Sequence, residues 1–351
     1  MKPKHFVILA ILAAVSTAIA ITSYAANNTW SPGRVSGARM FPALAANAGA
    51  VAAIELRQGP KVLTLEKAEG GPWRLKERGG YPVPADKLRT LMVALAEADL
   101  VEAKTRVADR YGLIDLEEPT GAGAKSRSVR LLDAKGSVLA EAVVGKKRGD
   151  AFGFGKSGTY VRKPGDAQSW LANADLDVSA DLKDWVKTDV FQTDSSKVSR
   201  VTVEMPGEQP LKIERNADTK KLAVAGIPQG QKLKEEGTAD SITRAAANID
   251  FDDVRKQTST AAAKDVSTIK LETDNGLTVT LRLRKDGDAQ WLSVTAAGES
   301  DAKKAADEIT ARTAGWEYQL NANKVTSLLK RRADLFEKIA DEKEKEKEKK
   351  P

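Results

Sequence analysis

The chain has 351 residues, 41% apolar and 30% charged, a composition typical of soluble globular proteins with about two domains. It has no cysteine, which excludes disulfides, thiolate metal sites and cysteine nucleophiles, and its one histidine, His5, lies in a predicted targeting segment. The sequence beyond that segment therefore lacks the histidine of zinc sites and catalytic triads. The net charge is +7, but acids and bases mostly alternate and aromatic residues are only 5%. This pattern favours a mixed solvated surface, and we expect no binding of nucleic acid.

The N-terminus, residues 1–26, has the composition of an export segment. Two lysines precede an uncharged apolar run over residues 6–21, and Ser23-Tyr24-Ala25 fits a small-residue cleavage site. Residues 6–26 are also long enough to span a bilayer, so a cleaved signal peptide and an uncleaved transmembrane helix are both open. Both interpretations predict an extracytoplasmic protein, at the inner membrane facing the periplasm or, after cleavage, in the periplasm. Residues 27–48, rich in Gly, Pro, Ala and Asn, are predicted to form a linker.

Strand signals begin at Val51. Short apolar runs separated by Gly59-Pro60 and Gly70-Gly71-Pro72 predict a three-stranded meander. Pro84-Ala85-Asp86 then opens a helix, because the apolar residues that follow recur with helical spacing: Leu88, Leu91, Met92 and Leu95. A meander followed by a helix thus opens the first half, which we assign to residues 49–190.

A similar unit follows in the second part of the chain. Three strand signals between Val198 and Val224 precede a helix opened by Thr238-Ala239-Asp240. Several segments of the two parts match in the same order: Ala85-Asp86-x-Leu88 with Ala239-Asp240-x-Ile242 at an offset of 154 residues, VRLLDAKG from Val129 with IKLETDNG from Ile269, and Tyr160 through Leu171 with Tyr318 through Leu329. This order predicts an internal duplication.

The predicted fold class is therefore α+β. We expect two halves, residues 49–190 and 197–340, each an antiparallel β-meander with helices, behind an N-terminal membrane or signal helix. The second half should end in a long helix that starts at Asn321 or Asn323, with an apolar stripe formed by Val325, Leu328, Leu329, Ala333, Phe336 and Ile339. The charged tail, residues 341–351, offers nothing to bury and is predicted to be a solvated helical extension or disordered.

Two segments partly match known motifs, one a phosphate-binding loop and the other a catalytic serine–lysine pair. The glycine-rich segment 149–157 ends in Gly155-Lys156-Ser157, but Asp150 stands where a P-loop needs its first glycine, and the residues that follow predict a strand instead of a helix. We therefore interpret it as a hairpin connection. Ser327 and Lys330 have the spacing of a serine–lysine pair, but the companion motifs are absent.

The remaining candidates are carboxylates and tryptophans. A paired acid–base site is physically possible among Asp109, Asp115, Glu117, Glu118, Asp175, Asp177, Asp181, Asp250, Asp252 and Asp253. The run Asp250–Asp253 lacks the glycine and distal glutamate of a calcium loop, so a junction with solvated acids is the favoured interpretation. The expected core tryptophans are Trp73, Trp170, Trp185, Trp291 and Trp316. We assign no catalytic, cofactor-binding or metal-binding residue, and we expect no cofactor.

A family resemblance rests on structural landmarks spread over residues 49–340. They are the N-terminal apolar segment, Trp73-x-Leu75, Pro84-Ala85-Asp86, Tyr111-Gly112-Leu113 with Asp115 and Pro119, VRLLDAKG, Gly145, Tyr160-Val161 and the stretch from Trp185 to Phe191. With these the chain resembles the domain of unknown function 4340 family, whose members accompany ABC transporters of the gliding-motility type. In this sequence Ile114 stands between the Tyr-Gly-Leu landmark and the aspartate that usually follows it directly.

The resemblance implies a non-enzymatic, extracytoplasmic accessory subunit of an ABC-type transport system that acts through protein or cargo binding. Its expected partners are membrane or periplasmic subunits of the transporter, together with the membrane itself through the N-terminal segment. Two alternatives stay open: a periplasmic enzyme that attacks envelope polymers through carboxylates alone, and a structural protein of the cell envelope. Converging carboxylates in a cleft, one of them in apolar surroundings, would favour the enzyme.

Overall fold

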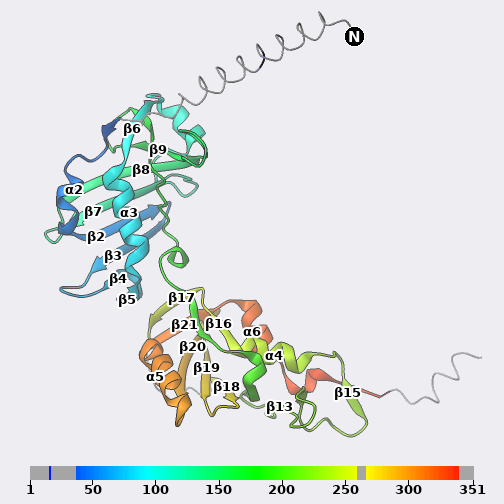
Figure 1. The fold of residues 1–351 in the computed structure, drawn as a ribbon. Helices are drawn as coiled ribbons and strands as arrows, with labels where there is room; N and C mark the ends of the chain where they lie inside the picture. The colour runs from blue at the N-terminus through cyan, green and yellow to red at the C-terminus, as the bar shows by residue number, and fades with distance from the viewer. Residues whose placement is uncertain (1–15, 17–36, 259–265, 340–351) are drawn as a thin grey trace, which may run out of the picture. The chain divides into compact units, whose positions relative to one another are not determined.

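The computed structural model describes residue 16 and residues 37–258 and 266–339. The predicted export segment, apart from Ser16, and the charged tail 341–351 lie outside this range. Within the described residues, no helix has the length and apolar content needed to cross a bilayer. The chain divides into two compact units (Figure 1): unit 1 comprises Met1–Glu69 and Ala85–Asp181, and unit 2 comprises Gly70–Pro84 and Leu182–Pro351.

Unit 1 is built on an antiparallel sheet with the strand order β1-β6-β10-β9-β8-β7-β2-β3. The bounds are β1 Ala38–Arg39, β2 Val51–Gln58, β3 Lys61–Lys67, β6 Asp99–Ala103, β7 Arg127–Asp133, β8 Val138–Arg148, β9 Gly158–Arg162 and β10 Ser169–Ala172. At its centre Ile54 lies opposite both Leu65 and Leu131, and all three are fully buried. From Ile54 to Arg57, buried residues alternate with partly exposed ones along β2, and this alternation fixes which face of the strand forms the core.

The helices of unit 1 are α2, Leu44–Asn47, and α3, Ala85–Glu97, with a 3₁₀ segment η3 at Ala108–Ile114. The predicted helix after Pro84 is confirmed as α3, which lies across the sheet in Figure 1. Leu88, Leu91 and Leu95 are buried along one face, as their spacing predicts.

Unit 2 contains a sheet with the order β14-β13-β12-β18-β19-β20-β21-β17 and two smaller ribbons, β11-β16 and β15-β22. The bounds are β11 Asp189–Gln192, β12 Val198–Glu204, β13 Leu211–Arg215, β14 Leu222–Val224, β15 Gln231–Leu233, β16 Asn248–Asp250, β17 Asp253–Lys256, β18 Val266–Thr273, β19 Thr278–Asp286, β20 Ala289–Ala297, β21 Trp316–Leu320 and β22 Phe336–Lys338. Its helices are α4 Thr238–Ala247, α5 Asp301–Thr313 and α6 Ala322–Leu328, with 3₁₀ segments that include η4 Leu182–Asp184 and η6 Arg332–Leu335. The hairpin of β4, Trp73–Leu75, and β5, Tyr81–Val83, also belongs to this unit.

The predicted combination of antiparallel sheets and helices is confirmed, since the strands pair antiparallel throughout the described sheets. The two units also share a strand order. In unit 1 it is β6-β10-β9-β8-β7-β2-β3, and in unit 2 it is β17-β21-β20-β19-β18-β12-β13. The registers agree as well, because Leu56 faces Val129 in unit 1 and Val203 faces Ile269 in unit 2.

The prediction of a long helix near the end of the chain is wrong, because the helix ends after two turns. Asn321 caps α6 as predicted, with its side-chain oxygen accepting from the Lys324 amide at 2.8 Å, but the helix ends at Leu328. Phe336 instead begins β22 and lies opposite Leu233 of β15. Phe336 is buried in the paired strand and Leu335 in η6, so tertiary contacts override the helical periodicity of the sequence.

Candidate functional site

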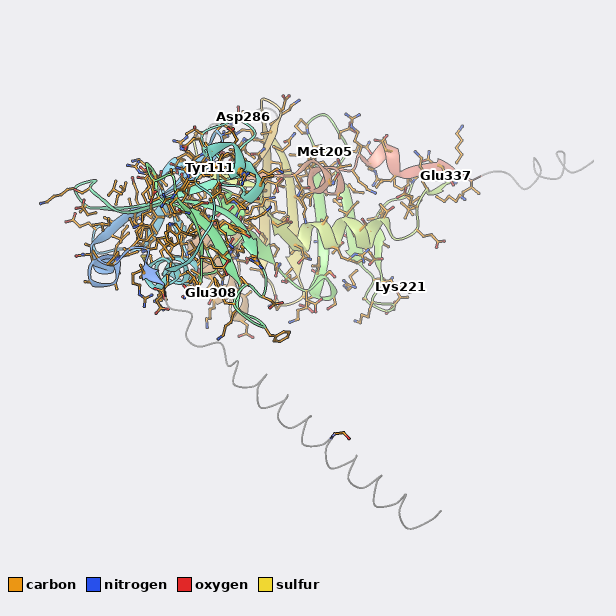
Figure 2. All side chains as sticks on the ribbon, turned by 90° about the horizontal axis from the view of Figure 1, so that it is seen from above. Tyr111, Met205, Lys221, Asp286, Glu308 and Glu337 are labelled. Atoms are coloured by element: carbon orange, nitrogen blue, oxygen red, sulfur yellow. The ribbon has the colours of Figure 1, made fainter. Side chains whose placement is uncertain are left out.

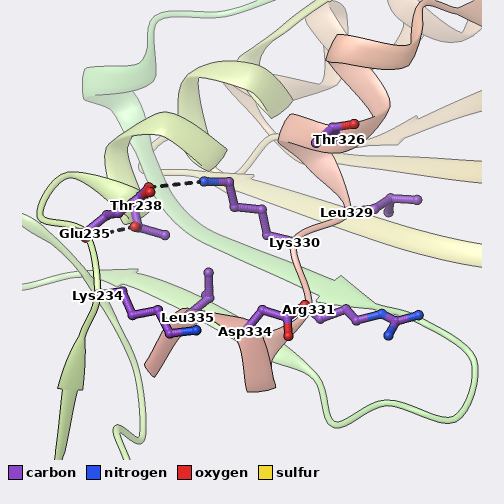
Figure 3. A pocket seen from close by; sticks show the side chains of 9 residues that line it. All are labelled: Lys234, Glu235, Thr238, Thr326, Leu329, Lys330, Arg331, Asp334 and Leu335. Carbon is purple, nitrogen blue, oxygen red and sulfur yellow. Dashed lines mark hydrogen bonds and ion pairs between the residues drawn. The ribbon is translucent and has the colours of Figure 1, made fainter. Parts of the chain in front are cut away.

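A cleft in unit 2 lies where the end of α6, the η6 segment, the end of β15 and the start of α4 meet (Figure 3). We call it the α4–α6 cleft. Its volume is about 370 Å³, and it is open to solvent along one side. The lining residues are Lys234, Glu235, Thr238, Thr326, Leu329, Lys330, Arg331, Asp334 and Leu335.

Backbone hydrogen bonds hold the walls of the cleft in place. The Lys234 amide donates to the Leu335 carbonyl at 2.9 Å and extends the β15–β22 ribbon into the cleft. The Leu329 amide donates to the Val325 carbonyl at 2.8 Å, which closes the last turn of α6. Thr238, the first residue of α4, donates its hydroxyl to the Glu235 carbonyl at 2.8 Å. The cleft is therefore a preformed surface in which the main chain has its own partners.

Its charged side chains fall into two groups. Lys330 pairs with Glu235 at 3.7 Å (Figure 3), and Arg331 reaches Glu208 at 3.6 Å. Among the residues that the structure describes, the Lys234 ammonium and the Asp334 carboxylate have no hydrogen bond or ion pair. The cleft thus offers one unpaired charge of each sign beside the apolar Leu329 and Leu335.

The hydroxyls of the cleft are not arranged for nucleophilic chemistry. Thr326 donates to the Ala322 carbonyl at 2.9 Å, and Thr238 is bonded to a carbonyl as well. Ser327 and Lys330, which have the spacing of a serine–lysine pair, lie at the end of α6 beside the cleft. Ser327 donates to the Asn323 carbonyl at 2.9 Å, whereas Lys330 lies beyond the end of the helix and pairs with Glu235. A nucleophile needs a base within hydrogen-bond reach, and these hydroxyls contact carbonyl oxygens instead.

The acidic run 250–253, from the end of β16 to the start of β17, forms ion pairs with cations of unit 2. Asp250 pairs with Lys324 at 3.1 Å, Asp252 with Lys183 at 2.7 Å, and Asp253 with Arg78 at 2.5 Å. Across residues 37–258 and 266–339, no group of three or more acidic or histidine side chains could hold a metal ion. The three carboxylates therefore serve as separate links between elements.

The acids that follow the Tyr-Gly-Leu landmark in unit 1 also stabilise the fold. Burial acts to raise the pKa of Glu117, but the amides that it accepts from, including those of Lys125 at 2.6 Å and Ser126 at 3.1 Å, hold that pKa below its usual value. Glu118 pairs at 2.6 Å with Arg162, whose guanidinium lies 4.8 Å from the centre of the Tyr111 ring.

The turn around Tyr111 ends in a left-handed residue. Asp115, and not Gly112, takes this conformation, with a φ of 56°, where η3 ends. The Leu116 amide donates to the Tyr111 carbonyl at 2.9 Å across that turn, and the Tyr111 hydroxyl donates to the Ala167 carbonyl at 2.6 Å. The landmark therefore anchors a turn.

The glycine-rich segment 149–157 connects β8 to β9, which pair antiparallel, so the predicted hairpin connection is confirmed. Of the five tryptophans expected in the core, Trp73 and Trp185 are buried, whereas Trp170, Trp291 and Trp316 are partly exposed. A second depression of about 680 Å³ borders α3 in unit 1, where Arg39, Asp99 and Asn173 largely bond to one another and to the main chain. We take the α4–α6 cleft as the candidate site because it places the unpaired Lys234 and Asp334 beside the apolar Leu329 and Leu335.

Sequence reasoning did not single out Lys234, Glu235 or Asp334. These residues come from two separate segments, and their charges resemble those of any solvated surface in the sequence. Only the end of α6 at Leu328 and the pairing of β22 with β15 bring them together. The serine–lysine spacing drew attention to Lys330, which does line the cleft, but as an ion-pair partner of Glu235 and not as a catalytic base.

The comparisons with known proteins give one match. The family model described as "Domain of unknown function (DUF4340)" matches residues 73–271, more than half of the chain and parts of both units. No curated protein and no solved structure matches the chain.

Proposed function

The chain belongs to the DUF4340 family, and from that premise we propose that it is a non-enzymatic, extracytoplasmic accessory subunit of an ABC-type transport system. It would act by binding a membrane or periplasmic subunit of the transporter, or its cargo. The observation that carries a binding role is the α4–α6 cleft with its unpaired charges of opposite sign, Lys234 and Asp334. A polypeptide segment with charges of both signs and an apolar side chain would complement it.

The pairing of the acids supports binding over catalysis. A carboxylate enzyme needs two acids that converge on a substrate, one with its pKa raised by apolar surroundings. Asp250, Asp252 and Asp253 instead each contact a different cation. We therefore favour the binding role over an enzyme acting on envelope polymers. We also favour it over a purely structural envelope protein, because a structural protein would not need the preformed α4–α6 cleft.

We propose that the N-terminal segment, residues 1–26, directs the chain out of the cytoplasm as a signal peptide or retains it as a membrane anchor. The described units would then face the periplasm, on the inner membrane or free of it. The basic start and uncharged apolar run support this. Detecting Met1 or a start near Ala26 in the protein from its native host distinguishes the two forms.

We also propose that the chain arose by internal duplication, with the meander-and-helix units in residues 49–190 and 197–340. The shared strand order and the equal registers of Leu56 with Val129 and Val203 with Ile269 support it. A duplicated scaffold would give the protein two related surfaces, of which the α4–α6 cleft has become distinct through α6 and the β15–β22 ribbon.

A crosslinking experiment tests the proposed partner. A photoreactive residue at Lys234, in the full chain in its native membranes, should attach to a subunit of an ABC transporter. The matched control is the same residue at Lys221, an exposed lysine that Figure 2 shows at the margin of unit 2. Recovery of the same proteins from both positions, or of no transporter subunit from Lys234, would overturn the proposal.

A further inference from the structure

The connection between β8 and β9, residues 149–157, holds two phenylalanines in opposite environments. Phe152 is buried, and its ring packs so closely on Gly158 that a side chain there would overlap it. Phe154, two residues later, is fully exposed. The exposed ring of Phe154 contributes no buried apolar area to unit 1, so it is available for a contact outside the unit.

Hydrogen bonds within the loop keep Phe154 at the outside. The Asp150 carboxylate accepts from the Gly155 amide at 2.7 Å, the Lys156 amide donates to the Gly153 carbonyl at 2.9 Å, and the Phe152 amide donates to the Lys156 carbonyl at 3.1 Å. Gly153 and Gly155 take positive φ angles of 107° and 72°, which side chains rarely adopt. Burial of Phe152 at the base and the tight turn at the tip therefore preorganise the projecting ring.

Cations flank this ring. Arg148 ends β8 and Lys156 follows Phe154, and neither has an ion pair or side-chain hydrogen bond among the described residues. Lys146 donates to the carbonyl of Leu113, a mostly exposed leucine, which adds a second apolar side chain beside the base of the hairpin. The nearby Lys147 is neutralised by Asp175 at 2.5 Å and Asp177 at 4.0 Å. Arg148, which also helps to lower the pKa of Glu102, and Lys156 supply the remaining cationic charge, against the single carboxylate of Asp150 in the loop.

The geometry points to a second membrane contact: the 149–157 loop inserts Phe154 into the interfacial region of an anionic bilayer, with Arg148 and Lys156 at the headgroups. An aromatic ring flanked by cations has the chemistry of an interfacial anchor. This inference rests on the proposed membrane anchor. If that anchor ends at Ala26, residues 27–36 reach at most about 35 Å, so unit 1, which follows them, stays near the bilayer.

The absence of cysteine from the chain permits a direct test. The full chain is reconstituted in vesicles of phosphatidylcholine, with or without phosphatidylglycerol, carrying an environment-sensitive dye on Phe154→Cys. We expect blue-shifted, more intense emission with both lipids, and a stronger response with phosphatidylglycerol. The matched control is Lys135→Cys, on the turn at the opposite end of the same strand β8, whose dye should report water.

Two variants separate the contributions of ring and charge. With the dye on Ser157→Cys, the emission shift should be lost when Phe154→Ser is added. With the dye on Phe154→Cys, Lys156→Gln should reduce the preference for phosphatidylglycerol about fivefold, the effect of one interfacial charge. Both side chains are exposed, so neither change should unfold unit 1.

The outcomes distinguish the inference from the function on which it rests. A chain that floats with vesicles but whose dye at 154 reports water overturns the second contact and leaves the anchor intact. A chain that does not float overturns both. A shift that appears only when transporter subunits are present also overturns the inference, because the ring would then bind protein instead of lipid.

Discussion

The ring of Tyr81 stands edge-on to that of Trp316, with centroids 5.0 Å apart and planes at 83°. Tyr81 lies on the β4–β5 hairpin, whose residues, Gly70–Pro84, interrupt the sequence of unit 1 but belong to unit 2. The same ring lies 5.9 Å from Phe251, and its hydroxyl shares a hydrogen bond with that of Tyr318. The polypeptide therefore passes between the units three times, and aromatic packing holds the inserted hairpin in unit 2.

Removing the Tyr81 ring should weaken unit 2. Tyr81→Ala deletes a buried aromatic side chain, so we expect a loss of about 3 kcal/mol in the free energy of unfolding. Tyr81→Phe keeps the ring and removes the hydroxyl, and should cost about 1 kcal/mol. Urea unfolding followed by tryptophan fluorescence measures both. Equal effects from the two variants would show that the ring packing contributes little.

The same pair of tyrosines should make unit 2 sensitive to alkali. Burial raises the pKa of both Tyr81 and Tyr318 above the ordinary value of about 10. Below pH 10 the hydroxyls are protonated in the folded and unfolded states alike, and the stability they support is fully present. As the pH rises above about 10, the unfolded chain loses protons that the folded chain retains, so unfolding becomes easier.

We therefore expect the free energy of unfolding to fall between about pH 10 and 11.5. The decline should be shallower in Tyr318→Phe, measured by urea titrations at successive pH values. The control is Tyr160→Phe in unit 1, for which the decline should match that of the unchanged chain. An equally steep decline in Tyr318→Phe would assign the alkaline sensitivity to other groups.

A buried carboxylate in β21 should be costly to remove. Glu317 is 5% exposed and pairs with Arg255 at 3.0 Å and Arg284 at 3.1 Å, while the Arg255 guanidinium stacks 3.8 Å from the centre of the Trp291 ring. Glu317→Ala leaves two partly buried cations without their shared partner. We expect a loss of about 3 kcal/mol in the free energy of unfolding.

The control for that change is an exposed pair in the same unit. Asp307 of α5 lies 3.7 Å from Lys303, and both are about two-thirds exposed. Asp307→Ala should change the free energy of unfolding by at most about 0.5 kcal/mol. If the two variants lose the same stability in urea titrations, burial does not govern the effect.

Local sequence signals predicted most of the first elements. Apolar alternation around Ile54 and the helical spacing of Leu88, Leu91 and Leu95 depend on single elements, and both were correct. The match of VRLLDAKG with IKLETDNG also has the right register, because Val129 and Ile269 hold equivalent positions beside the central strand.

Predictions that depended on distant contacts did not hold. Tyr160 was set against Tyr318, but Tyr160 lies on β9, whereas Tyr318 lies on β21, which has the place of β10. The insertion of α5 between β20 and β21 shifts the alignment. The α4–α6 cleft could not be predicted from the sequence, because it depends on the pairing of β22 with β15, whereas the sequence predicts a helix over the residues of β22.

The structure explains why Gly145, a landmark of the family resemblance, is a glycine, and this explanation can be tested. Gly145 lies in β8 where that strand passes η3, and a Cβ there would overlap the carbonyl oxygen of Ile114 and lie 3.0 Å from that of Asp115. Carbonyl oxygens of a hydrogen-bonded turn cannot move as a flexible side chain would. Gly145→Ala should therefore destabilise unit 1 by about 2 kcal/mol.

The matched variant is Gly149→Ala, four residues further along, where an added Cβ meets no atom within 4 Å. That change should leave the urea midpoint almost unaltered, because its φ does not demand glycine. Hydrogen exchange should localise the effect of Gly145→Ala to the amides around η3, among them Leu116, which donates to Tyr111. If both glycines tolerate alanine equally, the close approach of β8 to η3 does not explain the landmark.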